Sequence, residues 1–300
     1  MDVIDCYSVT GGRKDLSIGN NLKVWAAVSI ALASGAIVLL VALTTTPTAY
    51  GASRDHGASF AVRCDFSHRN SDDPIVHPGK EGAAHSHDFF GNRSTKYDST
   101  YNSLLKADEG TTCSRVADKA AYWMPTVKWN GITLDSDRAV FYYRAGGKDH
   151  TKVLAHPAAL MVVTPPGKKV SWRCGRKGGG AKRPPSRCSK GVLGVRVIFP
   201  DCSNGKVDSY NHRAHMVYSR QIDGKVRCPR SHPRSVPVLT MNVTFPLPTN
   251  RGPVKLSSGR PSTMHADFFN AWRQETLIVL VRHCINNVPP GQRRPPECRA

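Results

Sequence analysis

The sequence predicts a mainly β fold: an antiparallel β-sandwich-like domain with few short helices, preceded by one transmembrane helix. Short runs rich in valine, isoleucine and aromatic residues recur along the chain between glycine and proline clusters, a pattern typical of antiparallel β architectures. Twenty residues without a charge lie near the N-terminus, which is the length of a membrane-spanning helix. Eight cysteines follow that run, which indicates a disulfide-bonded domain outside the cytoplasm.

The uncharged run covers residues 24–43, and Arg13, Lys14 and Lys23 precede it. A positive flank stays in the cytoplasm, so residues 1–23 are expected there and the rest of the chain outside. The alternative is a cleaved signal peptide, but the run is longer than the roughly 7–15 apolar residues of such peptides. We therefore expect a signal-anchor that makes the membrane one partner of the chain. The protein would be a single-pass protein of the cell membrane with an extracytoplasmic C-terminal domain.

The remaining elements follow in chain order. Residues 44–60 are rich in threonine, alanine, glycine and serine and are expected to form a linker. The folded domain is expected over residues 61–285, with a Pro- and Arg-rich tail over 286–300. β-Branched and aromatic residues favour strands, and they are enriched in residues 60–64, 139–144, 159–164, 170–174, 194–200, 214–218 and 236–245. Helices are expected at residues 103–106 and 271–284.

The cysteines agree with export. Cys6 lies on the expected cytoplasmic side, and the other eight form an even set suited to a disulfide framework. Eight cysteines allow 105 connectivities, so the pairing stays open. Disulfides between neighbouring cysteines close the shortest loops and lose the least chain entropy. These pairs are Cys174 with Cys188, Cys202 with Cys228, and Cys284 with Cys298. No Cys-x-x-Cys pair is present, which argues against a zinc–thiolate site.

The charge balance favours an anionic partner. The chain has 42 Lys and Arg against 22 Asp and Glu, a formal charge of +20. Residues 167–190 contain nine of these cations and no acid. Within this loop, four residues are the candidate polyanion-binding set: Arg176, Lys177, Lys182 and Arg183. The alternative is a solvated loop closed by a disulfide. No nucleotide-binding motif accompanies it, so outside the membrane we expect an anionic cell-envelope polysaccharide as partner and no nucleic acid.

Two histidine motifs stand out. The first is His85-Ser86-His87-Asp88-Phe89-Phe90-Gly91, and the second is its echo His265-Ala266-Asp267-Phe268-Phe269. Residues two apart point the same way in an extended chain. His85 and His87 are therefore expected to share one face, with Asp88 and Phe90 on the other. His212 and His215 lie between the two motifs in the sequence.

The motifs, taken together, resemble a known family. They run in order Asp73-Pro74-Ile75-Val76-His77-Pro78-Gly79, the first histidine motif, Thr111-Thr112-Cys113, Asp118-Lys119-Ala120-Ala121-Tyr122-Trp123-Met124-Pro125, Val197-Ile198-Phe199-Pro200-Asp201-Cys202, Asp208-Ser209-Tyr210-Asn211-His212-Arg213-Ala214-His215-Met216-Val217-Tyr218, Cys228-Pro229-Arg230-Ser231-His232-Pro233 and His265-Ala266-Asp267-Phe268-Phe269-Asn270-Ala271-Trp272. Over residues 60–285 the chain resembles the family catalogued as domain of unknown function 1996, found in secreted and membrane-anchored proteins of actinobacteria and fungi. It departs from the family pattern at Ser203-Asn204, where Trp-Asp is usual, and at Ala266 and Ala271, where glycine is usual. The resemblance implies export and carries no established reaction.

The side chains of the motifs predict a polar site. Neutral imidazole binds zinc or copper, and three histidines with an open position form a typical catalytic zinc site. His85, His87 and His265 are the candidate metal ligands. The candidate catalytic set is His85, His87, His215, His265 and Asp267. The candidate substrate-binding set is Asp88, Tyr122, Trp123 and His212, in which the aromatic rings would stack on a sugar. Two alternatives stay open: a histidine acting as general base beside an aspartate, and histidines that only pack against phenylalanine rings.

Two functions from different classes follow from these features. The first is a His/Asp-centred enzyme, a hydrolase or lyase, acting on a glycan of the cell envelope. The second is a non-catalytic module that binds an anionic envelope polymer through residues 167–190. A structural protein with neither activity is a third possibility.

Overall fold

The computed structural model describes residues 57–289, 292 and 294–300. The predicted cytoplasmic segment, the membrane anchor and most of the linker lie outside these described residues. Within them, no helix is both long and apolar enough to span a bilayer. The described part is mainly β, every strand pair in it is antiparallel and its helices are short, which confirms those predictions.

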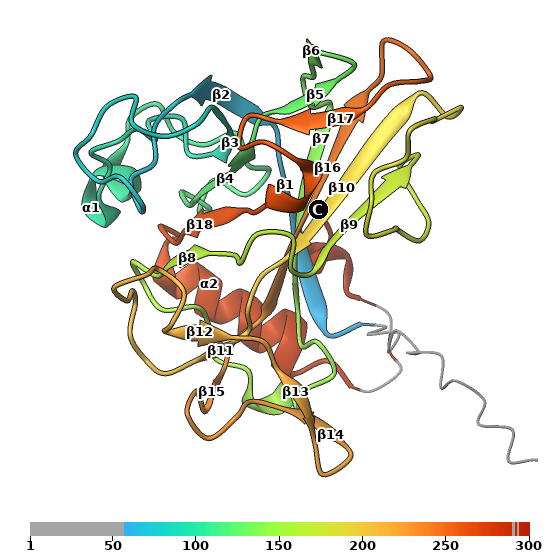
Figure 1. The fold of residues 1–300 in the computed structure, drawn as a ribbon. Helices are drawn as coiled ribbons and strands as arrows, with labels where there is room; N and C mark the ends of the chain where they lie inside the picture. Colours follow the sequence, from blue (N-terminus) through green and yellow to red (C-terminus); the bar gives the residue numbers. More distant parts are fainter. Residues whose placement is uncertain (1–56, 290–291, 293) are drawn as a thin grey trace, which may run out of the picture. The chain divides into compact units, whose positions relative to one another are not determined.

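The first sheet has five strands in the order β1-β7-β16-β10-β9 (Figure 1). Its members are β1 (Ser59–Cys64), β7 (Arg138–Arg144), β9 (Val170–Cys174), β10 (Val192–Ile198) and β16 (Val238–Pro246). All five overlap runs that the sequence predicts as strands. Valine and aromatic residues dominate them because side chains of this shape pack well on a pleated surface.

The second sheet has five strands in the order β2-β3-β4-β18-β8. They are β2 (Phe66–Asn70), β3 (His87–Gly91), β4 (Ala121–Pro125), β8 (Met161–Val163) and β18 (Asp267–Phe269). Every residue of β3, β4 and β18 is buried. These strands are covered on both faces, so apolar side chains occupy consecutive positions in them, as in Phe89-Phe90 and Phe268-Phe269.

The two sheets share one hydrophobic core. The ring centroids of Tyr122 in β4 and Phe141 in β7 are 3.9 Å apart, and Phe90 in β3 lies 6.3 Å from Phe141. The opposite face of the second sheet packs into a smaller cluster that includes Phe89 and Trp123. The second sheet therefore lies between two apolar layers. Polar side chains near the ends of its strands lie between the same two layers.

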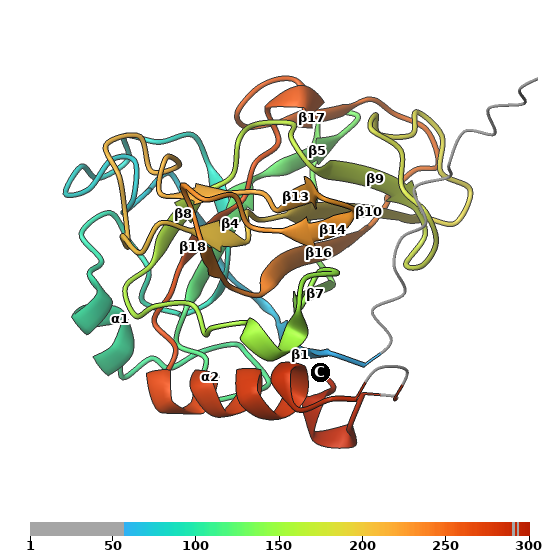
Figure 2. The same ribbon diagram turned by 90° about the horizontal axis from the view of Figure 1, so that it is seen from below.

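Smaller elements surround the two sheets (Figures 1 and 2). The short strands are β5 (Val127–Trp129), β6 (Ile132–Thr133), β17 (Val254–Leu256), β11 (Cys202–Ser203), β12 (Met216–Val217), β15 (Arg234–Ser235), β13 (Arg220–Ile222) and β14 (Lys225–Arg227). The helical turns are α1 (Tyr101–Lys106), α2 (Gln274–Val281), η1 (His150–Lys152), η2 (Pro261–Thr263), η3 (Arg282–Asn286) and η4 (Pro296–Cys298). Both predicted helices are present. α1 begins at Thr100 because its hydroxyl accepts the N–H of Ser103 and forms a capping box.

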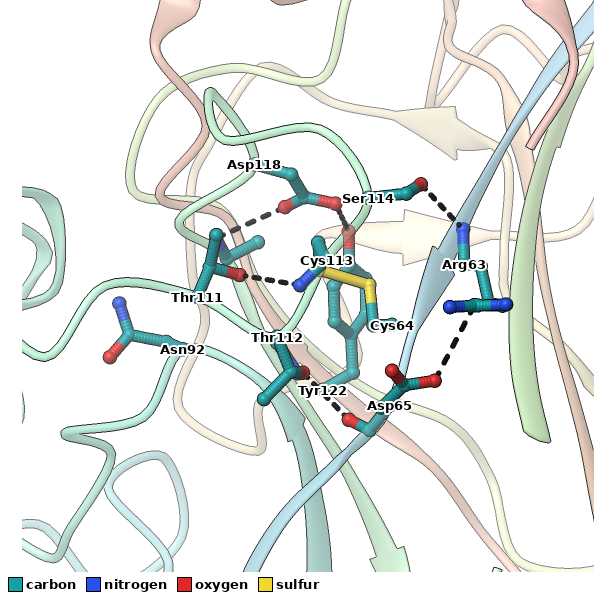
Figure 3. Close-up of a disulfide and its surroundings, with 12 residues drawn as sticks. Arg63, Cys64, Asp65, Asn92, Thr111, Thr112, Cys113, Ser114, Asp118 and Tyr122 are labelled. Atoms are coloured by element: carbon teal, nitrogen blue, oxygen red, sulfur yellow. Dashed lines mark hydrogen bonds and ion pairs between the residues drawn. A yellow bond between two sulfur atoms is a disulfide. The ribbon is translucent and has the colours of Figure 1, made fainter. Parts of the chain in front are cut away.

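Four disulfides hold the described chain together. Three join the sequence neighbours that have the shortest loops: Cys174–Cys188, Cys202–Cys228 and Cys284–Cys298. The fourth, Cys64–Cys113, joins the end of β1 to a loop 49 residues later (Figure 3). The predicted disulfide framework is confirmed, and it uses all eight cysteines that follow residue 43.

A buried polar network lies beside the Cys64–Cys113 disulfide (Figure 3). The Tyr122 hydroxyl donates to Asp118 over 2.9 Å and lies 2.6 Å from the Tyr143 hydroxyl. The Trp272 indole N–H donates to the Tyr143 hydroxyl over 3.1 Å. Asp118 is 0 % exposed, and burial raises its pKa to about 8 against the opposing effects of the Tyr122 and Ala120 hydrogen bonds and the Arg115 charge. This carboxyl is therefore protonated at neutral pH.

Candidate metal centre

Two strands of the second sheet bring the histidine motifs to one place. β3 and β18 both pair antiparallel with β4, so they run in the same direction and begin at the same edge of the sheet. His87 pairs with Pro125 of β4, and Asp267 pairs with Trp123, which lies two residues before Pro125 in the same strand. Residues two apart share a face, so the His87 and Asp267 side chains project from the same side of the sheet.

Three imidazoles and two carboxylates meet at this edge. The ring centroids of His85 and His87 are 4.3 Å apart, and that of His265 lies 5.2 Å from His85 and 6.0 Å from His87. One ligand atom of each histidine lies within 4.8 Å of those of the other two. One oxygen each of Asp73 and Asp267 and a nitrogen of His87 also lie within 4.8 Å of one another. We call these five residues the histidine centre.

The backbone orients two of the imidazoles. The Nδ1 atom of His87 lies 3.0 Å from the carbonyl oxygen of Asp72, and that of His265 lies 2.9 Å from the carbonyl oxygen of Thr263. A carbonyl only accepts, so each Nδ1 carries the hydrogen and each Nε2 keeps its lone pair. Histidines that ligate metals have this arrangement, in which an outer hydrogen bond sets the tautomer and the ring direction.

Several polar atoms of the centre have no hydrogen-bond partner among the described residues. They are the Nε2 atoms of His85 and His87 and both carboxylate oxygens of Asp267. His87 and Asp267 are 0 % exposed, and a buried polar atom without a partner costs about 1–3 kcal/mol. The Asp267 carboxylate also lies 3.6 Å from His265 Nε2, beyond hydrogen-bonding distance. A metal ion bound among these atoms would supply the partners that they lack.

The electrostatics of the centre favour neutral imidazoles. Burial, with a smaller contribution from His265 and His77, lowers the pKa of His85 to about 4. Burial likewise sets the pKa of His87 well below its usual value and lowers that of His265. Neutral imidazole is the form that binds a metal ion. Burial, reinforced by the Asp73 charge and opposed by Arg213, holds the pKa of Asp267 well above its usual range.

Asp73 is the member of the centre that sequence reasoning missed. Its carboxylate Oδ1 accepts the backbone N–H groups of Ile75 and Val76 over 2.9 and 2.8 Å, and the residue is 3 % exposed. Asp followed by Pro is typical of a turn, so the sequence indicated only a loop here. The signal that could have revealed it is the apolar Ile75 two residues later, which packs in the smaller cluster and draws the turn under the sheet.

Three residues predicted to contact substrate lie inside the protein. Tyr122 and Trp123 are 0 % exposed, so their rings offer no surface on which a sugar could stack. Asp88 lies on the opposite face of β3 from His87. Its carboxylate accepts from Arg69 over 2.6 Å and from Thr126 over 2.8 Å. We therefore correct the interpretation of these residues: they support the sheet and do not form a substrate surface.

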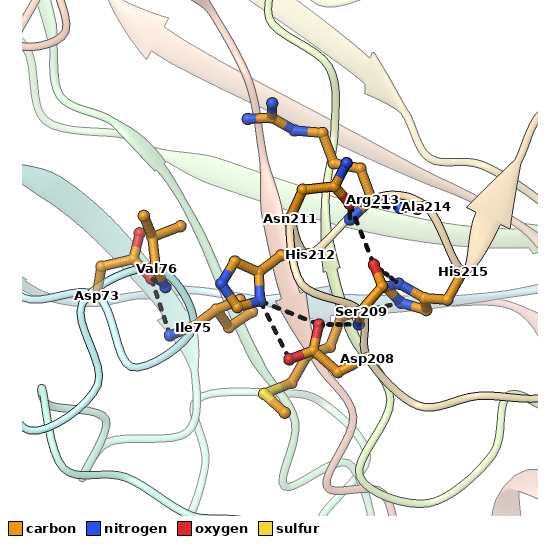
Figure 4. A network of polar contacts seen from close by, with 11 residues as sticks. Asp73, Ile75, Val76, Asp208, Ser209, Asn211, His212, Arg213, Ala214 and His215 are labelled. Atoms are coloured by element: carbon orange, nitrogen blue, oxygen red, sulfur yellow. Dashed lines mark hydrogen bonds and ion pairs between the residues drawn. The ribbon is translucent and has the colours of Figure 1, made fainter.

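The two histidines between the motifs have other partners (Figure 4). The Nδ1 atom of His215 lies 3.0 Å from the Ser209 hydroxyl, and its Nε2 lies 2.7 Å from the carbonyl oxygen of Met161. Both ring nitrogens are therefore engaged, and His215 stands outside the histidine centre. The Nδ1 atom of His212 lies 3.0 Å from the Asp208 carboxylate, so this half-buried histidine forms a separate pair.

The basic loop 167–190 is exposed around its tip. Arg176 forms an ion pair with Asp137, and its guanidinium also donates to Thr244 over 3.3 Å. Lys177, Lys182 and Arg183 are exposed, and no carboxylate of the described chain lies within ion-pair distance of them. One of the four predicted polyanion contacts is therefore neutralised within the protein.

The lack of hydrogen-bond donors to Asp267 among the described residues leads to a prediction about the metal-free protein. We expect Asp267→Asn to raise the free energy of unfolding at pH 7 by about 1–3 kcal/mol. Folding buries this carboxyl without a donor and raises its pKa, so the group must either hold a proton that the unfolded chain has lost or stay charged, whereas an amide remains neutral. The matched control is Asp88→Asn, which changes an equally buried carboxylate that is paired with Arg69. That variant should be less stable than the wild type. Urea unfolding of both variants with a chelator present measures the effect, and a loss of stability in both would contradict the prediction.

Comparison with known proteins places the chain in a family context. The sequence model of a family described as "Domain of unknown function (DUF1996)" matches residues 73–272. The matched segment contains all five residues of the histidine centre. No curated protein and no solved structure was found to match.

Proposed function

The chain belongs to the family described as Domain of unknown function (DUF1996), and on the basis of its histidine centre we propose that it is a metal-dependent enzyme acting on a glycan of the cell envelope. The observation that carries the proposal is the group of buried imidazole nitrogens and carboxylate oxygens that converge without hydrogen-bond partners of their own. An extracytoplasmic, membrane-anchored location forms part of the proposal. The uncharged run 24–43 and the four disulfides support it.

The ligand set fits a divalent transition metal. Imidazole nitrogen and carboxylate oxygen suit zinc, with copper as the second candidate. Zinc binds imidazole nitrogen at about 2.0–2.1 Å, which places neighbouring ligand atoms about 3.3 Å apart in a tetrahedron. The ligand atoms of the three histidines lie within 4.8 Å of one another, so binding requires them to move closer by at most about 1.5 Å. His85 and His265 are only half-buried, and they form the side of the centre that solvent reaches.

The chemistry that this centre supports best is hydrolysis. A metal ion held by three histidines lowers the pKa of a bound water to about 7, which makes a nucleophile at neutral pH. Asp73 and Asp267 lie beside His87, where, with a metal bound, one of them would orient the attacking water and accept a proton. A lyase would use the same carboxylates to remove a proton from the sugar, so the product of the reaction distinguishes the two.

A second candidate function is supported by the basic loop. Lys177, Lys182 and Arg183 remain exposed and without an acidic partner in the described chain, so residues 167–190 can contact an anionic envelope polymer. Under this alternative the protein binds the polymer and catalyses no reaction. Removal of the metal would then leave its binding unchanged.

Turnover by the full-length protein tests the proposed enzyme. Incubated with envelope polysaccharides, the zinc-loaded protein should release new reducing ends, or unsaturated sugars if it is a lyase. Chelation should abolish the release, and added zinc should restore it. His265→Ala should abolish it as well, since that variant removes one ligand of the centre.

The matched control is His283→Ala, which removes an exposed histidine paired with Glu297 outside the centre. This variant should retain full turnover. Equal activity of the His265→Ala variant and the wild type, with zinc bound in both, would contradict the proposal. Retention of the polymer without turnover in every zinc-loaded form would favour the binding module.

A further inference from the structure

We infer that a groove between the η1 turn and the β13–β14 hairpin binds an acidic polysaccharide, a function that nothing in the two histidine motifs or in the loop 167–190 indicates. The groove has a volume of about 1050 Å³. Its lining includes five cations, Lys148, Lys152, Lys225, Arg227 and Arg234, and one acid, Asp149. The inference stands apart from the proposed metal chemistry, because none of these residues belongs to the histidine centre.

The positive charge of the groove is largely uncompensated. Lys152 lies 3.3 Å from Asp149, and the buried Lys148 pairs with the buried Asp201. For the other three cations of the lining, no carboxylate of the described residues lies within ion-pair distance. These three, Lys225, Arg227 and Arg234, are exposed. A concave surface lined by one sign of charge concentrates ligands of the opposite sign.

The hairpin places like charges against each other. In the register of β13 and β14, Arg220 lies directly opposite Arg227. Like charges at opposite positions of an antiparallel pair are destabilising. An anion bound beside Arg227 would offset this repulsion. The strand pair therefore has an unfavourable charge arrangement that a ligand of the inferred class relieves.

The walls of the groove are rigid. The hairpin turns through Asp223 and Gly224, whose φ angles of 49° and 70° fit a tight two-residue turn with positive φ at both positions. The Cys202–Cys228 disulfide attaches the residue after β14 to β11. The Arg234 guanidinium lies over Gly205, where a Cβ atom would come within 2.9 Å of it. The backbone that carries these cations is therefore restrained before a ligand arrives, which lowers the entropic cost of binding.

The chemistry of the lining favours an acidic glycan over a nucleic acid. Single-stranded nucleic acids are held by aromatic side chains on which their bases stack, together with cations. The lining of this groove contains no aromatic residue. It offers cations, the amide of Gln221 and backbone groups, which suit sulfate, phosphate or carboxylate groups on a hydroxyl-rich chain.

A pair of triple variants with equal loss of charge tests the inference. The groove variant is Lys225→Gln/Arg227→Gln/Arg234→Gln. The control is Lys80→Gln/Arg93→Gln/Lys128→Gln, which removes three exposed cations outside the groove and outside the loop 167–190. Binding of the full-length protein to immobilised dextran sulfate is measured across a salt series, with uncharged dextran as blank. For the groove variant we expect affinity to fall about tenfold or more and the slope of log affinity against log salt to become shallower by about two to three.

The control variant should bind nearly as well as the wild type. An equal loss of affinity in both triple variants would show that only net charge matters and would overturn the inference, as would unchanged binding by the groove variant. All six substituted residues are exposed, so the thermal unfolding temperature of neither variant should fall below that of the wild type. Tighter binding to a single-stranded oligonucleotide than to dextran sulfate of equal charge would overturn the assignment to a glycan.

Discussion

Replacing His87 by alanine is expected to lower the affinity of the protein for zinc by about 100-fold to 1000-fold. Structural zinc sites bind with about 10–16 kcal/mol spread over four ligands, so one ligand contributes about 3–4 kcal/mol. His87 belongs to both the three-histidine group and the Asp73–Asp267 group, so its loss affects every possible arrangement of ligands in the centre. Its Nε2 is buried and free of protein partners within the described chain, so metal binding breaks no hydrogen bond there.

Competition with a zinc-binding dye measures this affinity in the full-length protein. His68→Ala is the matched control, because His68 lies in the neighbouring strand β2 and both of its ring nitrogens are engaged, with Ser67 and with Thr95. That variant should bind zinc as tightly as the wild type. Stoichiometric zinc binding by the wild type that His87→Ala leaves intact would place the metal elsewhere.

Replacing Asp118 by asparagine is expected to change the pH dependence of stability. The pKa of this buried carboxyl is raised to about 8, whereas an aspartate in the unfolded chain has a pKa of about 3.9. Between these values the unfolded chain has lost the proton and the folded protein keeps it. The contribution of Asp118 to stability is therefore complete below pH 4 and falls as the pH rises to about 8. A difference of about four pKa units corresponds to about 5 kcal/mol.

Asparagine has no proton to lose, and its amide can replace the protonated acid beside Tyr122. The free energy of unfolding of Asp118→Asn minus that of the wild type should therefore increase by about 5 kcal/mol from pH 4 to pH 8. Urea unfolding at a series of pH values measures this difference, in which the titration of other groups cancels. Asp98→Asn, at an exposed carboxylate, should give a flat difference. A flat difference for Asp118→Asn would show that the buried acid is already ionised near pH 4.

Local patterns predicted much of the antiparallel β core. The five strands of the first sheet come from runs of β-branched and aromatic residues, whose shape favours strands wherever they lie in the chain. The second sheet was predicted less completely. β2 and β4 fall outside the segments that the sequence predicts as strands. β2 is only half-buried and contains polar residues, so its apolar signal is weak, and its pairing with β3 decides its conformation.

The site was also predicted only in part, because a local pattern shows on which face of a strand a side chain lies but does not show how deeply it is buried. Alternation along a strand is a local property, so it correctly placed Asp88 and Phe90 on the opposite face from His87. Burial is not local. Tyr122 and Trp123 have the composition of a sugar-binding wall, but both faces of β4 are covered, and that depends on elements far away in the sequence. The groove at the β13–β14 hairpin likewise depends on how η1 and β15 pack, which no single segment reveals.

By itself the sequence determined the antiparallel β class, the disulfide framework and the two histidine motifs, because composition, cysteine count and the two-residue repeat of a strand are properties of short segments. Only the tertiary structure decided that the motifs converge. β3 and β18 begin at the same edge because both pair with β4, and this strand order is set by the packing of the whole domain. The same packing draws the Asp73 turn beneath the sheet. There its carboxylate completes a centre whose members are spread over nearly two hundred residues of the chain.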